Sequence, residues 1–471
     1  MKKMKTAKMS VFRNKRFFTG LTAFLSLTVL LSGCTIFDAS LDVLLSPPKL
    51  TEAQTAIYNA LIRNTGEQID LVYPRRGDYR SPFVLYDIDG EKTDEAIVFY
   101  REKASSLQTE GSLRINLLDQ RDGEWISVYD RPLTGIDVEQ VDFYNFSGTE
   151  GNINIVVSCS VLSQTEKSLC VLEYSEKALV PIYSGNYSFM DAVHLNSDQR
   201  PELFLVSYDA ALGYNSAFIL GNTSKTYEEG NSFGIISSIP LYSDVAGIQR
   251  LIRQRIKEND YLIFLDYGKG DNAYGTQILH CFNDNLTYIS SESLSRRNNS
   301  NVPLLYSADI DGDGRIEIPV TVPVAGYESL TIPEQMFFVE WYYSDEENNF
   351  NVNKKFLTYV SLGGEYVFYM PVRWQGFVTV EKNGNIINFV VYEPGSSDPP
   401  VLLSICVSTS LPAANEGWER YGEKDSNVYI KTATGGDPMA LTADELKSCL
   451  SLTNVIQAAG STVSSKGRGR K

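Results

Sequence analysis

Residues 309–320 read Asp-Ile-Asp-Gly-Asp-Gly-Arg-Ile-Glu-Ile-Pro-Val, and this stretch decides how the rest of the chain is interpreted. Acidic side chains stand at every second position of a loop, and an apolar, strand-like run follows at once. Side chains at the first, third and fifth positions of such a loop point inward at one spot, a glycine permits the tight turn, and an acid at the ninth closes the ring. Oxygen ligands arranged in this way suit a hard cation such as calcium. The stretch therefore predicts a calcium loop that leads into a β-strand.

Two further stretches repeat this pattern. Residues 87–98 read Asp-Ile-Asp-Gly-Glu-Lys-Thr-Asp-Glu-Ala-Ile-Val, and residues 194–205 read His-Leu-Asn-Ser-Asp-Gln-Arg-Pro-Glu-Leu-Phe-Leu. A weakened copy with extra residues lies at 141–157. The three clear copies recur roughly every 110 residues, which leaves room for two units of about 55 residues in each interval, and units of this size are typical of propeller blades.

The sequence between residues 83 and 429 favours β-structure throughout. Short apolar runs such as 203–206 alternate with turn residues such as Asp122-Gly and Lys382-Asn-Gly. This alternation predicts strands joined by turns. Residues 245–256 fit either a short helix or a strand. The chain is therefore predicted to be all-β, with a β-propeller-like repeat domain of about six to seven blades and short flanking N- and C-terminal helices.

The N-terminus has the features of a bacterial lipoprotein signal. Seven basic residues and no acidic ones fall in residues 1–33, and the apolar run at 17–31 is too short for a comfortable membrane span. The run ends in Leu31-Ser-Gly-Cys, which resembles the lipobox whose cysteine receives diacylglycerol. Cys34 is the expected lipidation site, and its acyl chains would tether the mature protein to the extracytoplasmic face of the bacterial cell membrane. An ordinary secretory signal or a short anchor is the alternative.

Two helices are expected beside the repeat domain. A capping box at 51–54 precedes apolar residues at helical spacing and predicts a helix over 51–64. A second capping box at 442–445 predicts a closing helix over 442–458. The expected organisation is a signal peptide (1–33), a lipid-attachment linker with a short helix (34–66), the propeller (67–435), a C-terminal helix (436–460) and a disordered basic tail (461–471).

The acidic loops resemble the calcium loops of FG-GAP/VCBS-type repeats, which build β-propellers in integrin α-subunits and many bacterial surface proteins. The resemblance implies a structural calcium ion that its ligands saturate, so that it activates no water. In the 309–317 loop the implied ligands are Asp309, Asp311, Asp313, the carbonyl of Arg315, and Glu317. The last of these replaces the aspartate that is usual in the family.

The 87–95 loop offers a second calcium set but lacks the glycine after the fifth position. Its implied ligands are Asp87, Asp89, Glu91, the carbonyl of Thr93, and Glu95. The 194–202 loop has a histidine and an amide, which are poor calcium ligands, and we expect a metal-free turn there. Its side chains are His194, Asn196, Asp198 and Glu202. Aspartate-rich turns that cap strands by side-chain to backbone hydrogen bonds, without metal, are the alternative.

Five cysteines remain besides Cys34, an odd number that implies no complete disulfide framework. Cys159 and Cys170 lie symmetrically around the turn-like residues 163–166, so they would face each other in a hairpin centred there. Outside the cell such a pair could form a disulfide. Two buried thiols in neighbouring strands are the alternative.

The charge of the chain bears on its partners. The formal net charge is −16, and removal of the seven basic residues of the signal peptide would make it −23. So acidic a body repels nucleic acid and suits divalent cations, basic partners or plain solubility. The expected partners are the membrane, through the lipid anchor, and an unidentified envelope protein or glycan.

Enzymatic motifs are scarce in this sequence. It has only two histidines, His194 and His280, and neither a His-Glu-x-x-His motif nor a Walker loop. The sequence therefore favours a non-catalytic binding or scaffold protein of the cell envelope, stabilised by structural calcium. One alternative is a secreted carbohydrate-active or other hydrolase on the same fold, which would need paired carboxylates in the propeller channel. The other is a solute-binding lipoprotein of a transporter, which would need two α/β lobes.

Overall fold

The computed structural model describes residues 50–453 apart from 67–68, 103–111, 164, 210–212, 224–231, 244, 246, 271–272, 290–304, 332–333, 347–349, 364, 413–416, 424–426 and 434–436. The chain divides into two compact units, residues 1–59 and 60–471, and the boundary falls within the helix α3 (Glu52–Thr65). The predicted signal peptide, Cys34 and the basic tail lie outside the described residues. In the described part of the chain, no helix has both the length and the apolar content that a membrane span requires.

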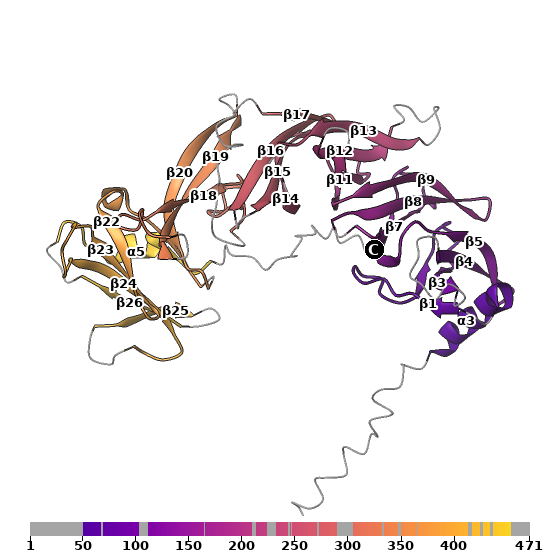
Figure 1. The fold of residues 1–471 in the computed structure, drawn as a ribbon, viewed down its shortest axis with the longest axis horizontal. Helices are drawn as coiled ribbons and strands as arrows, with labels where there is room; N and C mark the ends of the chain where they lie inside the picture. Colours follow the sequence, from indigo (N-terminus) through magenta and orange to yellow (C-terminus); the bar gives the residue numbers. More distant parts are fainter. Residues whose placement is uncertain are drawn as a thin grey trace, which may run out of the picture. The chain divides into compact units, whose positions relative to one another are not determined.

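The second unit is built from antiparallel sheets whose strands mostly follow one another along the chain (Figure 1). The first sheet contains β1 (Ile69–Leu71), β2 (Phe83–Tyr86), β3 (Glu95–Glu102), β4 (Leu113–Arg121) and β5 (Glu124–Pro132). The second contains β6 (Asp137–Tyr144), β7 (Asn154–Ser160), β8 (Lys167–Ser175) and β9 (Ala178–Tyr187). The third contains β10 (Phe189–Val193), β11 (Glu202–Asp209), β12 (Tyr214–Asn222) and β13 (Phe233–Pro240).

Three further sheets complete the described part. The fourth contains β14 (Gly247–Lys257), β15 (Asp260–Gly270), β16 (Ala273–Phe282) and β17 (Asn285–Tyr288). The fifth contains β18 (Ile318–Pro323), β19 (Phe337–Asp345), β20 (Asn351–Val360), β21 (Val367–Tyr369) and the late strand β27 (Leu450–Ser451). The sixth contains β22 (Val378–Asn383), β23 (Ile386–Val391), β24 (Val401–Ser408), β25 (Glu419–Glu423) and β26 (Asn427–Thr432).

The inner strands of the second to fifth sheets are apolar on both faces because each of these sheets packs between two others. In β11, Leu203 and Leu205 pack against the second sheet, whereas Phe204 and Val206 pack against the fourth. Successive side chains of a strand point to opposite faces, so a strand buried on both sides needs an unbroken apolar run. The apolar runs in the sequence therefore mark strands that lie between neighbouring sheets.

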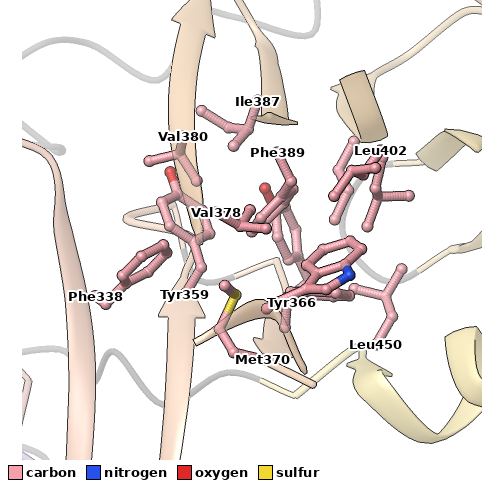
Figure 2. Packing of buried hydrophobic residues seen from close by; sticks show 14 of the residues in the cluster. Phe338, Tyr359, Tyr366, Met370, Val378, Val380, Ile387, Phe389, Leu402 and Leu450 are labelled. Atoms are coloured by element: carbon pink, nitrogen blue, oxygen red, sulfur yellow. The ribbon is translucent and has the colours of Figure 1, made fainter. Parts of the chain in front are cut away.

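Apolar clusters join each sheet to the next one along the chain. Separate clusters link the first sheet to the second, the second to the third, the third to the fourth, and the fourth to the fifth. Between the fifth and sixth sheets, Phe338 and Tyr359 face Val380 and Phe389 across the largest cluster (Figure 2). This face-to-face succession of antiparallel sheets is the arrangement of propeller blades. The predicted all-β, propeller-like fold is confirmed, and the expected count of six to seven blades stays a prediction.

The structure confirms the first helix and shortens the last. Helix α3 follows the capping box, in which Thr51 and Gln54 exchange hydrogen bonds of 3.0 and 3.2 Å. The closing helix α5 (Ala443–Cys449) has the expected capping box but does not continue to residue 458. It ends because Leu450 and Ser451 pair with β21 instead, so the predicted helix over 442–458 was too long.

Residues 245–256, which the sequence left open between helix and strand, belong mainly to β14. Ile248 and Leu251 of this strand contact the third sheet, whereas Ile252 and Ile256 contact the fifth. A register shift between Ile248 and Arg250 explains why the apolar spacing looked partly helical.

Candidate functional site

The acidic loops occupy equivalent places in their sheets, each leading into a buried strand. In every copy the closing glutamate is buried and accepts the backbone N–H of the loop's second residue. The bonds are Ile88 N to Glu95 Oε2 at 2.9 Å, Leu195 N to Glu202 Oε2 at 3.0 Å and Ile310 N to Glu317 Oε2 at 3.0 Å. The three carboxyl side chains are at most 3 % exposed as residues. The recurrence of one geometry supports the interpretation of these loops as copies of one unit.

The first loop residue is fixed by backbone groups as well. Asp87 Oδ1 accepts Gly90 N at 2.7 Å, and Asp309 Oδ1 accepts Gly312 N at the same distance. Both glycines have a φ of 79°, which a residue with a side chain rarely adopts. The two loops are therefore superposable turns, as the sequence pattern predicted.

The weakened copy near residue 145 keeps this geometry without acids. Asn145 Oδ1 accepts Gly148 N at 2.7 Å, and Asn154 Oδ1 accepts Phe146 N at 3.4 Å. Here the closing residue stands eight positions after its donor rather than seven, which accommodates the inserted residue. The amides of this copy supply the same hydrogen bonds as the carboxylates of the others.

In the 309–317 loop a lysine provides the positive charge. Lys355 Nζ lies 2.9 Å from Asp311 Oδ2, 2.6 Å from Asp313 Oδ2 and 2.9 Å from Glu317 Oε1. Burial lowers the pKa of Lys355, but the hydrogen bonds to these three carboxylates outweigh burial and raise it, so the side chain stays an ammonium ion. A calcium ion with the predicted ligands would need the space that this ammonium group takes. The backbone N–H of Arg315 donates to Asp313 at 2.9 Å.

A β-bulge explains how Lys355 reaches the loop. The register of β19 with β20 shifts between Trp341 and Tyr342, whose partners are Phe356 and Lys354. Lys355 is thus the extra residue of a bulge, and bulges redirect side chains. Its position 38 residues after Glu317 gave the sequence analysis no reason to connect the two.

The 194–202 loop replaces the cation with an amide. Asn196 Nδ2 donates to Glu202 Oε1 at 2.9 Å and to Asp284 Oδ2 at 3.0 Å. Burial raises the pKa of Glu202 to about 8, with Asp284 adding to the rise. His194 contributes no ligand to this group, since its Nδ1 lies 3.2 Å from the carbonyl oxygen of Arg200. The metal-free turn expected here stays a prediction.

The 87–95 loop holds its carboxylates together without a basic partner. Oxygen atoms of Asp87, Asp89 and Glu95 lie within 4.8 Å of one another. Among the described residues, no lysine or arginine forms an ion pair with this group. Burial raises the pKa of Glu95 to about 7, and Asp89 and Asp87 add to the rise. Glu91 is exposed and does not belong to the converging carboxylates, whereas the carbonyl of Thr93 stays a predicted ligand.

A second cluster of carboxylates lies on the first strands of neighbouring sheets, and sequence reasoning missed it. Asp142 stands on β6 and accepts a hydrogen bond of 2.8 Å from Gln140 Nε2. Burial raises the pKa of Asp142 to about 6, against the opposing effect of Gln140, and the nearby Asp78 adds to the rise. No basic side chain contributes to this shift. Asp142 is therefore a carboxyl group that stays protonated at pH values above those usual for an aspartate.

Asp191 on β10 has a different environment. Burial raises its pKa, but the positive charge of Arg253 on β14 opposes that rise. Tyr144, two residues after Asp142 on the same face of β6, experiences both carboxylates: burial raises its pKa first, and Asp142 and Asp191 raise it further. Tyr144 therefore lies within electrostatic range of both acids, and we call Asp142, Tyr144, Asp191 and Arg253 the first-strand cluster.

The first-strand cluster can do acid–base chemistry. Burial raises the pKa of both acids, but only Asp191 has a cation that opposes the rise. Two carboxyl groups in different environments can serve as one acid and one base. Asp142, without a cation, is suited to the protonated role, and Asp191, beside Arg253, to the ionised one. The signal for it in the sequence was the alternation of polar Gln140, Asp142 and Tyr144 with apolar residues, within a strand that was assigned to a weakened calcium unit.

The two cysteines singled out in the sequence are close but not opposite. In the register of β7 with β8, Cys159 pairs with Ser168 and Cys170 pairs with Val157, so the thiols are diagonal neighbours. Both are free in the structure. The expectation that they face each other directly was wrong by two positions, because the hairpin is not centred on residues 163–166.

Comparison with known proteins bears on fold and on one functional expectation. No family model and no curated protein matches the chain. Among solved structures it is similar to an alpha-L-arabinofuranosidase from Fusarium graminearum, with 11 % identity over 77 % of this chain and 96 % of that one, at a TM-score of 0.25. It is also similar to an endo-1,5-alpha-L-arabinanase from Thermotoga petrophila, with 9 % identity over 77 % of this chain and 98 % of that one, again at 0.25.

These matches correct the main functional expectation from the sequence. The predicted non-catalytic scaffold was wrong: the structures matched are carbohydrate hydrolases, which correspond to the alternative on the same fold. The expectation that the chain is not an enzyme is corrected with it. With TM-scores of 0.25, the placing of an active site rests on this chain's own residues.

The lysine in the 309–317 loop generates a first prediction. Lys355→Met should lower the free energy of unfolding by about 3 kcal/mol, because it leaves a buried carboxylate without its partner. Lys354→Met is the matched control. Lys354 precedes Lys355 in the chain and pairs with the partly exposed Glu340 at 2.8 Å, so its substitution should lower the free energy of unfolding by less than about 1 kcal/mol. Urea denaturation in the presence of a chelator measures both. Equal stability of the two variants would show that Lys355 is not the counter-ion of this loop.

Proposed function

We propose that this protein is a hydrolase of glycosidic bonds whose catalytic groups are Asp142 and Asp191. The first-strand cluster is the single observation that carries the proposal. It places two carboxyl groups of different environment within electrostatic range of Tyr144, on strands β6 and β10 that begin adjacent sheets. Glycoside hydrolysis needs such a pair, one carboxylic acid to protonate the leaving oxygen and one carboxylate to act as base or nucleophile.

The surroundings favour one assignment of roles. Burial, with Asp78 nearby, raises the pKa of Asp142 to about 6 against the opposing hydrogen bond from Gln140, so Asp142 keeps its proton to higher pH and can donate it. Asp191 lies in the positive field of Arg253, which stabilises its ionised form. Arg253 is itself fixed, since its Nη1 donates to the carbonyl oxygen of His194 at 2.6 Å. An acid and a base held by separate partners can act in concert.

Amide substitutions test this assignment. Asp142→Asn and Asp191→Asn should each lower kcat by about 100- to 10,000-fold, the usual contribution of a positioned acid or base, with little change in stability. Hydrolysis of a panel of aryl glycosides and oligosaccharides, arabinobiose among them, provides the measurement. Asp398→Asn, in an exposed loop of the sixth sheet, is the control and should retain full activity.

The pH profile distinguishes the roles. If Asp142 donates the proton, the rate should fall as the pH rises through about 6, where this group ionises. The rate should rise at lower pH as Asp191 becomes ionised. Wild-type protein that hydrolyses none of these glycosides, or an Asp142→Asn variant that keeps the fall near this pH, contradicts the proposal.

A lipid anchor is proposed for the mature protein on the basis of Cys34 and the basic and apolar segments before it. It would hold the enzyme at the extracytoplasmic face of the membrane, within reach of glycans. Cys34→Ala should move the protein from the membrane fraction to the soluble fraction of the cells, as immunoblotting of fractionated cells would reveal. Wild-type protein found entirely in the soluble fraction would refute the anchor.

Calcium is proposed for the 87–95 loop rather than for the 309–317 loop. Oxygen atoms of Asp87, Asp89 and Glu95 converge within 4.8 Å, as do those of Asp309, Asp311 and Glu317. Lys355 pairs with two acids of the second set, whereas no ion pair among the described residues neutralises the first. The loops at 87, 145, 194 and 309 share one geometry, which also supports kinship with FG-GAP/VCBS repeats. When bound, calcium would hold the loop that joins β2 to β3 and would take no part in the reaction.

Thermal unfolding tests the calcium site. Calcium at 100 times its dissociation constant should add about 2.7 kcal/mol to the free energy of unfolding of the wild type, which appears as a higher Tm. Asp89→Asn should abolish the rise, whereas Asp311→Asn should keep it because Lys355 already serves that loop. A wild-type Tm that does not respond to calcium, or a response lost only in Asp311→Asn, would place the ion elsewhere or nowhere.

A further inference from the structure

A cavity of about 260 Å³ lies between the first two sheets. Its wall is formed by the end of β5 with the link at 133–134, and by β7, β8 and β9. Apolar Leu133, Val157 and Leu169 form part of its floor, and the exposed Ser184 and Asn186 stand at its opening. This space is large enough for several water molecules or one small organic molecule.

The polar groups of this cavity are rich in hydrogen-bond donors. Arg131 enters it from β5, and its Nη1 donates to the carbonyl oxygen of Leu179 at 3.2 Å. The Nε of the same guanidinium is buried and has no hydrogen-bond partner. A buried donor without an acceptor costs about 1 to 3 kcal/mol. The guanidinium of Arg131 therefore has hydrogen-bonding capacity that the described residues leave unused.

The remaining lining contributes no negative charge. Hydroxyls of Thr134, Ser168 and Ser184, the thiols of Cys159 and Cys170, and the amide of Asn186 complete the polar set, and no aspartate or glutamate belongs to it. The nearby carboxylate of Asp137 is engaged by arginines outside the cavity, at 2.5 Å by Arg75 and at 3.1 Å by Arg101. The cavity is thus a positively charged pocket in an acidic protein.

We propose that this cavity binds a small oxyanion, a carboxylate or phosphate group carried on a molecule no larger than a monosaccharide, with Arg131 as its principal ligand. The guanidinium can meet an oxyanion with more than one N–H, and Arg is suited to this planar, charge-assisted contact. Strands β7 and β8, the inner strands of the second sheet, form one wall of the cavity. The site is separate from the first-strand cluster and does not depend on the proposed hydrolase activity.

Binding to the full-length protein is tested with two probes, glucuronate and inorganic phosphate, by isothermal titration calorimetry. Wild-type protein should bind one of them saturably, and the stronger of the two identifies the oxyanion as carboxylate or phosphate. Arg131→Gln should weaken that binding at least tenfold. Arg121→Gln is the matched control, because Arg121 lies on the neighbouring strand β4 and pairs only with Asp119 at 3.1 Å.

Chemical modification gives a readout that does not depend on the variants. Cys170 is half-buried and lines the cavity, whereas Cys449 is half-buried and lies in helix α5, far along the chain. A bound oxyanion should slow the alkylation of Cys170 by iodoacetamide at least threefold and leave Cys449 unchanged, as peptide mass spectrometry would show. The proposal is overturned if neither probe binds, if Arg131→Gln binds as tightly as wild type, or if Cys170 reacts at the same rate with and without the probe.

Discussion

A buried carboxylate that accepts a backbone N–H from the opposite end of its own loop is the contact on which the repeated sheets depend. Glu95, Glu202 and Glu317 each make it, at distances of 2.9 to 3.0 Å. Separation of the loop's two ends would leave both a buried amide and a buried acid unpaired, at a cost of about 1 to 3 kcal/mol for each neutral group and more for a charge. The loop therefore keeps its shape even where Asn154 takes the place of the acid.

Burial of that carboxylate's charge is unfavourable, and a different group lies beside the carboxylate in each of the three sheets. An ammonium group meets Glu317, an amide meets Glu202, and Glu95 has only other carboxylates beside it. Buried charges require partners, and a group without one shifts its pKa toward the neutral form. Backbone geometry is thus common to the repeats, whereas the chemistry that neutralises them is local and free to vary.

The sequence predicted the parts of this molecule that depend on neighbours along the chain. Loop glycines, capping boxes and apolar runs act within about ten residues, and so the loop geometry, helix α3 and the all-β class could be inferred. Lys355 could not be, because a bulge 38 residues away brings it to Glu317. Asp142 and Asp191 were missed for the same reason: they belong to different sheets, and the charged groups that act on their pKa values, Asp78 and Arg253, lie far from them in the sequence. The cavity at Arg131 likewise exists only between two sheets.

Lys355 has a consequence for how the fifth sheet withstands changes in its surroundings. A dissolved ion must be captured from solution, and its loss of translational freedom is repeated at every binding event. The ammonium group of Lys355 is covalently part of β20, so its entropy is given up once, when the strand folds. Chelation, dilution or exchange with competing ions cannot remove it. The stability of the 309–317 loop is consequently independent of the metal ions in the medium. The stability of a related loop that binds a dissolved ion would vary with the concentration of that ion.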